Sequence, residues 1–467
     1  MYSVKEMQGL EKPRRLFGTN GIRKIVNREL TPEFAAKIGE AIGSFFRQGN
    51  ILIGYDGRKS NIMLVNAVTS GLLSTGCKVY DGGMAPTPCI QYAVGNHKMD
   101  GGVMVTASHN PPEYNGIKVM WNDGVEITSR QEREIEDLFF KERIRLASWE
   151  CIKQRFSLLG LLDEYRESIK RHINVAEIRK RHYHIVVDAG NGVASLVIPY
   201  LARDLGCKVT TINGDIDGTF PGRMPEPRPE NLGSLAATIT AIGADIGVAF
   251  DGDADRSIFV DDEGKVQWGD RSFALIEEDF LMMNQGETIV TPVSSSQVVK
   301  DIAEKYEGRL VWTKVGSIIV SHTMKRLKAK LGGEENGGVF YGPHQPVRDG
   351  AMSTALILSI MAKADETLSE LFEALPRYYL VKDKVVCPTE QKINVFKTLN
   401  EEVNHLNPER IDGVKLWFPD NSSILIRPSG TEPIYRFYAE AKTKEKAVKL
   451  VKEYKEKLQH LISPREK

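Results

Sequence analysis

Short apolar runs alternate with helix-length segments along most of the chain, and one such unit occurs three times. Each unit starts with an apolar run that ends in a turn, continues through a helical segment, and returns to a second apolar run after a glycine. The three starting runs are residues 51–56, 185–188 and 289–290, and helices are expected over 63–74 and 298–305. Strands that alternate with helices of this length are typical of βαβ units with mostly parallel sheets.

Each of the three units goes on to a further strand that ends in a polar loop. These loops are residues 106–110, 251–256 and 333–337. Functional loops of open α/β sheets lie beyond the carboxyl ends of the strands. Three polar loops at equivalent positions therefore predict a shared functional role, and three unrelated surface turns are the weaker interpretation.

The chain after residue 377 has a different pattern. Strands are expected over 379–381, 384–387, 424–427 and 436–441, and a charged amphipathic helix over 443–461. The predicted fold is α/β, with three similar domains built on mixed or parallel sheets and a smaller C-terminal α+β domain. The predicted domains are 1–155 with a serine loop, 156–256 with an acidic loop, 257–376 with a glycine-rich loop, and 377–467 with an Arg-Pro-Ser-Gly-Thr loop.

Composition narrows the class of protein. The 467 residues carry 62 Lys and Arg against 62 Asp and Glu, so no excess of positive charge is available for a large nucleic-acid-binding face. An apolar run long enough for a transmembrane helix is absent, and the N-terminus lacks the apolar region of a signal peptide. The five cysteines are scattered without CxxC spacing, which indicates a reducing cytoplasm and neither a zinc site nor a disulfide framework. We expect a cytoplasmic protein without a nucleic-acid or membrane partner; a homo-oligomer stays open.

The first polar loop presents a serine. In Val-Thr-Ala-Ser-His-Asn-Pro-Pro (105–112), apolar residues lead into small ones and a proline pair ends the segment, so Ser108 is expected on an exposed turn. A Ser/His hydrolase is one alternative, but the GxSxG elbow is absent. Adjacent side chains of an extended segment point apart, so His109 is expected to be poorly placed as a base. A turn with purely structural caps also stays open.

The second polar loop carries three carboxylates. Asp251, Asp253 and Asp255 follow the apolar run 246–250, and alternate residues of an extended or turning backbone point the same way. Three converging like charges are costly without a counter-cation, so a hard divalent metal is the natural partner. An EF-hand is excluded because its sixth position is Arg256 instead of glycine. A site with positions left for water and a phosphate oxygen suits Mg²⁺ in phosphoryl transfer; a solvated acidic turn is the alternative.

Two more loops bear groups that recognise ligands. Residues 427–433 combine Arg427, two hydroxyl groups and a glycine amide, which suits a phosphate; the nucleotide pattern GxxxxGK[ST] is absent. Residues 332–338 contain four glycines and two adjacent acids, which suits sugar hydroxyl groups as well as a flexible surface turn. Together the loops predict phosphoryl transfer between Ser108 and a phosphorylated metabolite that is not a nucleotide.

These motifs resemble the α-D-phosphohexomutase superfamily, which includes phosphoglucomutase, phosphomannomutase and phosphoglucosamine mutase. The resemblance rests on four strings in the family's order: Leu-Phe-Gly-Thr-Asn-Gly-Ile-Arg (16–23), Thr-Ala-Ser-His-Asn-Pro (106–111), Asp-Gly-Asp-Ala-Asp-Arg (251–256) and Arg-Pro-Ser-Gly-Thr-Glu-Pro (427–433). It covers nearly the whole chain. The resemblance implies four domains around a central cleft, three of them alike, and a small-molecule sugar phosphate as substrate.

The resemblance also implies roles for particular residues. Ser108 is expected to be a phosphoserine that exchanges its phosphoryl group with a hexose monophosphate through a hexose 1,6-bisphosphate, which also serves as activator. One Mg²⁺ per chain is expected on the Ser108 phosphate, Asp251, Asp253 and Asp255. The residues expected around the transferring phosphoryl group are Arg23, His109, Lys118 and Arg256, with Lys118 as acid/base because the family places a lysine ten residues after the serine. The residues expected to bind the sugar and the second phosphate are Glu334, Asn336, Thr313, Gly316, Ser317, Arg427, Ser429, Gly430 and Thr431.

The third unit departs from the common pattern of the family. Many relatives carry Gly-Glu-x-Ser-Gly-His, where this chain has Asn336 and Gly338, and many have a histidine where Ser317 stands. Asp349 is a substitute acid/base or part of a structural turn. The Glu-Asn-Gly-Gly form is similar to the archaeal branch, which includes both phosphomannomutase/phosphoglucomutase and phosphoglucosamine mutase.

The sequence predicts a mutase of mannose or glucose phosphates, with phosphoglucosamine mutase as the alternative. Two other classes are weaker. A phosphatase would let water intercept the phosphoserine, which a mutase must prevent. A sugar-phosphate sensor would have no need of the nucleophile Ser108.

Overall fold

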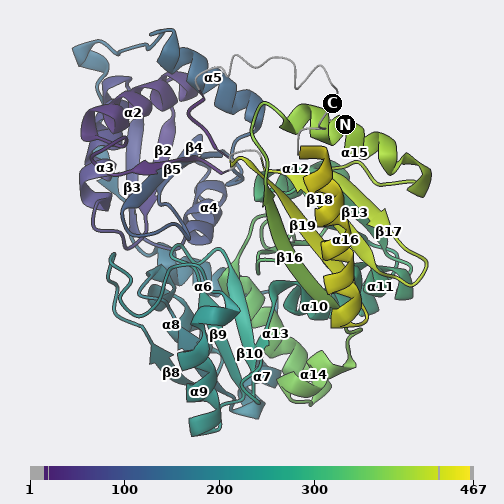
Figure 1. Ribbon diagram of the computed structural model, residues 1–467. Coiled ribbons are helices and arrows are strands. Elements are labelled where there is room, and N and C mark those ends of the chain that lie inside the picture. Colours follow the sequence, from purple (N-terminus) through teal and green to yellow (C-terminus); the bar gives the residue numbers. More distant parts are fainter. Residues whose placement is uncertain (1–14, 19, 430–431, 463–467) are drawn as a thin grey trace.

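The computed structural model describes residues 15–18, 20–429 and 432–462 and folds them into four units, each built on one β-sheet (Figure 1). The first sheet has six strands in the order β1-β5-β4-β2-β3-β6. The elements of this unit are β1 (Ile22–Ile25), α2 (Pro32–Phe46), β2 (Asn50–Tyr55), α3 (Asn61–Ser74), β3 (Lys78–Met84), α4 (Thr87–Asn96), β4 (Gly101–Val105), β5 (Tyr114–Trp121), α5 (Ser129–Phe140), the 3₁₀ helix η1 (Trp149–Cys151) and β6 (Arg155–Ser157).

The second unit lies below the first in Figure 1, and its sheet has the strand order β11-β10-β9-β7-β8. Its elements are α6 (Leu161–Lys170), α7 (Val175–Arg181), β7 (His184–Asp188), η2 (Val193–Leu196), α8 (Ile198–Asp204), β8 (Lys208–Ile212), η3 (Pro229–Asn231), α9 (Gly233–Ile242), β9 (Ile246–Phe250), β10 (Ser257–Asp261) and β11 (Val266–Gln267).

The third unit has a sheet of four strands in the order β13-β12-β14-β15. Its elements are α10 (Gly269–Met283), β12 (Thr288–Pro292), α11 (Gln297–Lys305), β13 (Arg309–Thr313), α12 (Ser317–Leu327), β14 (Leu331–Gly333), β15 (Val339–Tyr341), α13 (Gly350–Ala364) and α14 (Leu368–Ala374).

These three sheets share one arrangement. In each sheet a central strand (β2, β7 or β12) has a parallel neighbour on both sides. One of these neighbours (β4, β9 or β14) also pairs antiparallel with the strand that comes next in the chain (β5, β10 or β15). The three polar loops are the connections from β4 to β5, from β9 to β10 and from β14 to β15. The repeat deduced from the sequence and the position of its loops beyond the strand ends are therefore confirmed.

The fourth unit is smaller and its sheet, in the order β16-β19-β18-β17, is antiparallel throughout. The two strands expected over 379–381 and 384–387 are wrong as separate elements, because they form one strand that pairs with β19 over eight residue pairs. The strand β17 was not expected. The elements of this unit are β16 (Tyr379–Val386), α15 (Lys392–Glu402), η4 (Asn404–Leu406), β17 (Val414–Trp417), β18 (Ser423–Pro428), β19 (Ile434–Ala441) and α16 (Lys444–Ile462). The α/β fold class with a C-terminal α+β domain is confirmed.

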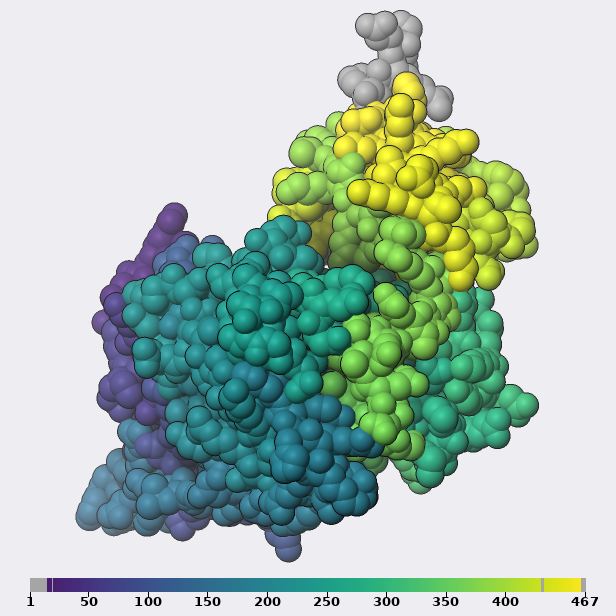
Figure 2. Space-filling model, turned by 90° about the horizontal axis from the view of Figure 1, so that it is seen from below, coloured from purple at the N-terminus to yellow at the C-terminus, as the bar shows by residue number. Residues whose placement is uncertain are grey.

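The hydrophobic cores show how the units are joined. One continuous cluster of buried apolar side chains runs through the first three units, while the fourth unit has a core of its own. In Figure 2 the fourth unit, in yellow, stands out from the rest as a lobe. Among the described residues, every helix is too short or too polar to span a bilayer.

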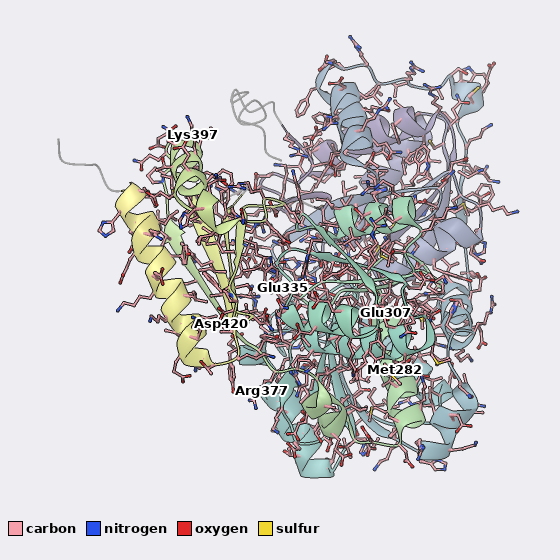
Figure 3. The ribbon with its side chains drawn as sticks, turned by 90° about the vertical axis from the view of Figure 1, so that its right-hand side faces the viewer. Met282, Glu307, Glu335, Arg377, Lys397 and Asp420 are labelled. Atoms are coloured by element: carbon pink, nitrogen blue, oxygen red, sulfur yellow. The ribbon has the colours of Figure 1, made fainter. Side chains whose placement is uncertain are left out.

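Polar contacts make up much of the junction between the third and fourth units. Glu335 lies between the sheet of the fourth unit and the body of the molecule (Figure 3), where the Lys382 ammonium lies 2.6 Å from its carboxylate. The Lys415 ammonium is held between the rings of Trp312 and Trp417, at 4.5 and 4.3 Å from their centres, and donates to the Val293 carbonyl at 2.8 Å. The fourth unit is thus attached through specific charged contacts.

Helices α2 and α3 pack closely because glycines stand where they cross. A Cβ atom at Gly71 would lie 2.1 Å from the carbonyl oxygen of Ala36, and one at Gly39 would lie 2.4 Å from the carbonyl oxygen of Val68. Both clashing atoms belong to helix backbone, which cannot rotate away as a side chain can. The two helices cover the sheet that carries Ser108, so their spacing bears on the position of the site.

We expect Gly71→Ala to lower the free energy of unfolding by about 1–3 kcal/mol, because overpacking outweighs the higher helix propensity of alanine. Calorimetric scans would measure the shift of the first cooperative transition. The matched control is Gly95→Ala in α4, where an added Cβ would lie 3.6 Å from the Asp123 carbonyl oxygen, an ordinary van der Waals distance. The control is expected to be neutral or stabilising by up to about 1 kcal/mol. Equal effects of the two substitutions would contradict the packing argument.

Candidate active site

Ser108 lies in the loop after β4 and has a left-handed backbone with φ +50°. It is fully buried, so the expectation of an exposed turn was wrong. Its Oγ donates to Asp251 Oδ2 at 2.8 Å, and its backbone N–H donates to the Thr106 hydroxyl at 2.8 Å. The Nδ1 atom of His109 is 3.4 Å from the Ser108 Oγ. The expectation of an extended segment whose neighbouring side chains point apart was therefore wrong, because the left-handed turn brings both side chains to one side.

Arg58 determines the shape of this turn. Its Nη2 donates to the carbonyl oxygens of Ser108 at 2.8 Å and Asn110 at 2.6 Å, and its Nη1 to those of Pro111 at 2.7 Å and Tyr114 at 2.8 Å. One buried guanidinium thus donates to four carbonyl groups of the same loop, and these hydrogen bonds fix the conformation of the loop. No sequence motif marks Arg58, because these four acceptors are backbone atoms.

Asp56 holds Arg58 in place from the end of β2. Its carboxylate accepts hydrogen bonds from the Thr106 hydroxyl at 2.6 Å, the Asn61 amide at 2.7 Å and the backbone N–H of Arg58 at 3.0 Å, and the Arg58 Nε lies 3.3 Å away. Complete burial raises the pKa of the Asp56 carboxyl, while Arg58 opposes this shift. The pair is interdependent, because either charge alone would be buried without a counter-charge.

The three aspartates converge as predicted in the loop between β9 and β10. All three are buried, and one carboxylate oxygen from each lies within 4.8 Å of the others. Ala254, between the second and third aspartates, has φ +58°, which turns the loop tightly enough for this convergence. The carboxylates are therefore placed to bind one cation together.

Donors from other parts of the chain hold one oxygen each of Asp253 and Asp255. Asp253 Oδ2 accepts from the Thr87 hydroxyl at 2.6 Å and from Lys118 Nζ at 2.7 Å. Asp255 Oδ2 accepts from Lys118 Nζ at 3.3 Å and from Arg348 Nη2 at 2.5 Å. The second oxygens, Oδ1 of Asp253 and Oδ1 of Asp255, are buried and have no hydrogen-bond partner among the described residues. Unsatisfied carboxylate oxygens beside a serine hydroxyl form a donor set that fits a hard divalent cation.

The pKa shifts of this cluster reflect burial and the charges packed around each group. Burial, followed by the charges of Asp255 and Asp253, raises the pKa of Asp251 well above its usual value. Burial acts in the same direction on Asp253, but the Lys118 ammonium prevails and holds its pKa below the ordinary range. Burial would lower the pKa of Lys118, yet Asp253 and Asp255 raise it, so its ammonium stays charged. Three carboxylates this close are stable together only with positive charge among them.

Two of the predicted arginines add positive charge to the same place. Arg23 Nη1 donates to the Asn110 side chain at 2.8 Å, and burial lowers its pKa to about 10. Arg256 Nε lies 3.9 Å from oxygens of Asp251 and Asp255. Burial and then the charges of Arg256 and Arg23 lower the pKa of His109, so its imidazole is neutral at neutral pH. The surroundings of Ser108 thus combine an acidic cluster with a positive shell.

Arg348, which no sequence motif marks, connects the glycine-rich loop of the third unit to the acidic cluster. Its Nη1 lies 3.4 Å from Glu334 Oε2, while its Nη2 binds Asp255. Burial raises the pKa of Glu334, and Arg348 opposes that shift. The side chain of Asn336 accepts from the backbone N–H of Gly338 at 3.3 Å. A Cβ atom at Gly338 would lie 2.5 Å from Arg348 Cδ, so the arginine uses the space that a larger residue would need.

Asp349 has a structural role. Its side chain caps α13 by accepting from the Met352 N–H at 2.9 Å, and it also accepts from the Tyr165 hydroxyl at 2.5 Å and the Gln345 amide at 2.9 Å. His344 Nδ1 lies 3.3 Å from its other oxygen. The structure therefore supports the structural turn and not the substitute acid/base.

The phosphate-loop residues of the fourth unit form a second group. Arg427 Nη2 lies 2.9 Å from Asp412 Oδ2, which also accepts from the Val315 N–H at 3.2 Å. Ser429 donates its N–H to the Ile434 carbonyl at 2.9 Å. Gly430 and Thr431 lie outside the described residues. Asp412, which no sequence motif marks, thus connects Arg427 to the loop between β13 and α12, which contains Gly316 and is flanked by Thr313 and Ser317.

The N-terminal segment connects the two groups. Asn20 donates to the Ser317 hydroxyl at 3.1 Å. The next residue, Gly21, has φ +78°, and an added Cβ would lie 3.2 Å from Lys118 Cγ. The segment thus runs from the third-unit loop to the lysine that holds Asp253. The structure therefore links residues from all four units, as a composite site requires.

Comparison with protein families matches four models across the chain. They are described as phosphoglucomutase/phosphomannomutase alpha/beta/alpha domain I (residues 14–145), domain II (163–264), domain III (268–379) and C-terminal domain (384–457). The four matches follow the four sheets in order.

Individual proteins give the same picture. The chain is 47% identical over 453 residues to a phosphoglucosamine/phosphogalactosamine mutase of Sulfurisphaera tokodaii, covering 94% of this chain and 98% of the relative. It is 45% identical over 439 residues to a phosphoglucomutase/phosphomannomutase of Thermococcus kodakarensis, covering 93% and 96%. A crystal structure of a phosphoglucomutase/phosphomannomutase family protein from Burkholderia thailandensis superimposes with a TM-score of 0.86 at 29% identity, covering 95% of this chain and 97% of that one.

We expect Arg58→Met to lower the free energy of unfolding by about 3–5 kcal/mol, because it leaves the Asp56 carboxylate buried without its cation. The double variant Asp56→Asn, Arg58→Met removes both charges and is expected to lose less than the sum of the single losses, with a coupling of about 1–3 kcal/mol. Denaturant or thermal unfolding of the four proteins would complete the cycle. Additive losses would show that the two side chains act independently.

Proposed function

The chain belongs to the phosphoglucomutase/phosphomannomutase family, and from that premise we propose that it interconverts the 1- and 6-phosphates of mannose or glucose through a phosphorylated Ser108. It is a phosphohexomutase, an isomerase of hexose phosphates. The observation that carries the proposal is the Ser108 hydroxyl at 2.8 Å from Asp251, beside two carboxylate oxygens that lack hydrogen-bond partners among the described residues. A nucleophilic hydroxyl next to a cation site is the arrangement that phosphoryl transfer needs.

The proposed reaction has two transfers of opposite direction. In the first, the bond between Ser108 Oγ and phosphorus breaks, and phosphorus bonds to the free hydroxyl of a hexose monophosphate, whose proton ends on the Ser108 oxygen. The hexose 1,6-bisphosphate then turns in the site. In the second, its other phosphoryl group returns to Ser108, and the proton passes back to the sugar oxygen. Lys118 is the proposed acid/base, and because its ammonium is charged it starts as the proton donor.

The proposed metal is one Mg²⁺ per chain, held by Asp251, Asp253, Asp255 and an oxygen of the Ser108 phosphate. Such an ion neutralises negative charge that develops on a transferring phosphoryl group. The oxygens Asp253 Oδ1 and Asp255 Oδ1 fit this role because their partner oxygens are already held by Thr87, Lys118 and Arg348.

The remaining residues are proposed to bind the substrate. Arg23, His109 and Arg256 surround the transferring phosphoryl group, and Arg348 joins them because it reaches the metal loop. The residues proposed to bind the sugar are Glu334, Asn336, Thr313, Gly316 and Ser317. Those proposed to bind the second phosphate are Arg427, Ser429, Gly430 and Thr431. Two phosphate sites on different units suit a bisphosphate that must be held at either end.

Three broader expectations stay proposals. The domain boundaries are proposed after residues 155, 256 and 376. Because β6 (Arg155–Ser157) pairs with the first sheet, and β10 and β11 with the second, the first two boundaries are better placed after residues 157 and 267. The five cysteines are unpaired, which supports a cytoplasmic location. The third is a homo-oligomer.

The second candidate is the interconversion of glucosamine 6-phosphate and glucosamine 1-phosphate. The relative from Sulfurisphaera tokodaii, named for glucosamine and galactosamine phosphates, favours it at 47% identity. The relative from Thermococcus kodakarensis, at 45%, favours the first candidate. Both reactions use the same transfer chemistry, so they differ in how the site receives one substituent of the sugar ring.

We expect Ser108→Ala to reduce kcat at least about a thousandfold, because it removes the nucleophile, while the protein still binds the hexose phosphate in calorimetric titration. In the parent enzyme treated with hexose 1,6-bisphosphate, peptide mass spectrometry should find a phosphoryl group on Ser108. The matched control is Ser234→Ala, an exposed serine of α9, which should retain full activity. Near-normal turnover by Ser108→Ala would reject the phosphoserine.

We expect kcat/KM for mannose 1-phosphate or glucose 1-phosphate to exceed that for glucosamine 1-phosphate by at least about tenfold, because a site that pairs a sugar hydroxyl disfavours a charged amine at the same position. Coupled assays with each substrate, Mg²⁺ and a trace of the matching bisphosphate would measure the ratio. The reverse order would establish the second candidate, and equal values would indicate a generalist.

A further inference from the structure

A serine, a histidine and an aspartate lie in line beside Arg348. Ser168 Oγ lies 2.8 Å from His344 Nε2, and His344 Nδ1 lies 3.3 Å from Asp349 Oδ2. This is the order of a hydrolase triad, but the side chains of His344 and Asp349 are only 1% exposed. Ser168 is buried as well, and its hydroxyl donates to the Tyr165 carbonyl at 2.7 Å. A substrate cannot reach this serine, so the three residues have a different role.

Aromatic rings from different units enclose the His344 imidazole. Tyr92 of α4 stacks on it with ring centres 5.2 Å apart, Tyr165 of α6 lies at 5.8 Å, and His172 lies at 5.4 Å. Helix α6 contacts both α4 and α13, so this histidine lies where the first three units meet (Figure 1). Packing on several sides leaves the imidazole one orientation.

Asp349 is held from the same three units. Its Oδ1 accepts from the Tyr165 hydroxyl at 2.5 Å and from the Met352 N–H at 2.9 Å. The Gln345 amide donates to Asp349 Oδ2 at 2.9 Å and also to the Pro88 carbonyl of the first unit at 3.0 Å. A carboxylate with this many partners has little freedom to move.

The next residue toward the N-terminus is Arg348. Its backbone forms a β-bridge with Phe340, so the chain is extended there, and neighbouring side chains of an extended chain point in opposite directions. Asp349 therefore points toward His344, whereas Arg348 points toward Asp255 and Glu334. The contacts of one side chain fix the starting point of the other.

The position of Arg348 bears directly on the acidic cluster. Its Nη2 donates to Asp255 Oδ2 at 2.5 Å, while Asp255 Oδ1 is buried without a hydrogen-bond partner in the described part of the chain. The guanidinium thus orients the carboxylate so that Oδ1 is left for a cation. A shift of residue 348 by about 1 Å would take this contact out of hydrogen-bond range.

We infer that His344, Tyr165 and Ser168 are positioning residues for the proposed reaction. They hold Asp349, and through it Arg348, so that Asp255 is oriented for the divalent cation. The inference rests on the proposed function, because it concerns the same metal site. The three residues act through Arg348 and touch neither the substrate nor the cation. Groups that orient a ligating carboxylate change the affinity of a site for its metal.

Mg²⁺ binding to the full chain, measured by calorimetric titration of metal-free protein, tests the inference. His344→Phe keeps an aromatic ring but loses both polar contacts, and we expect it to raise the Kd for Mg²⁺ about threefold to tenfold. Tyr165→Phe removes one hydrogen bond to Asp349 and is expected to change the Kd in the same direction. The matched control is Val299→Ala, which shortens a buried side chain of the third-unit core and should leave the Kd within about twofold. An unchanged Kd in both node variants would overturn the inference.

A double-variant cycle separates positioning from general loosening of the fold. In the Arg348→Met background, His344→Phe is expected to change the Kd for Mg²⁺ less than about twofold, because the arginine through which it acts is absent. The full threefold to tenfold loss in that background would show that His344 acts by another route, and would overturn the inference.

Failure of the proposed function has a different signature. It would appear as a parent protein that isomerises no hexose phosphate in the coupled assays. An active parent whose Mg²⁺ affinity does not respond to His344→Phe or Tyr165→Phe would overturn the positioning role alone.

Discussion

Repulsion among three buried carboxylates governs the architecture around it. Asp251, Asp253 and Asp255 approach within 4.8 Å, which is tolerable only because positive and hydrogen-bonding groups reach them from several directions. Thr87 and Lys118 come from the first unit and Arg348 from the third, so the acidic loop of the second unit is complete only when all three are assembled. The continuous hydrophobic core of these units supplies the rigidity that such a charge cluster needs.

One backbone arrangement presents three different sets of side chains. The loop from β4 to β5 carries the Ser108 hydroxyl, the loop from β9 to β10 carries three carboxylates, and the loop from β14 to β15 carries Glu334. The equivalent geometry places all three loops at the carboxyl ends of parallel strands, where side chains of different units can meet. The fourth unit contributes a loop from an antiparallel sheet and a separate core, and joins the others through charged contacts such as Lys382 with Glu335.

The sequence predicted what depends on periodicity and local spacing. Alternating apolar runs located the repeated units, and the spacing of the aspartates located the acidic cluster. It did not predict Arg58, because the carbonyl groups that Arg58 binds lie about 50 positions away and carry no sequence signal. It did not predict Arg348 either, because its partner Asp255 lies 93 positions away. The left-handed turn at Ser108 was missed for the same reason, since Arg58 imposes it from outside the loop. The strand β16 is continuous because it pairs with β19 along its whole length, and local propensity carries no information about such a distant partner.

The close contact between Gly338 and Arg348 has an evolutionary consequence. The family resemblance predicts a histidine where this chain has Gly338, but even a Cβ atom there would lie 2.5 Å from Arg348 Cδ. A histidine would fit only if residue 348 were smaller or moved, and that change would remove a counter-charge from Asp255 and Glu334. The two positions are therefore epistatic, because each restricts which residues the other can accept.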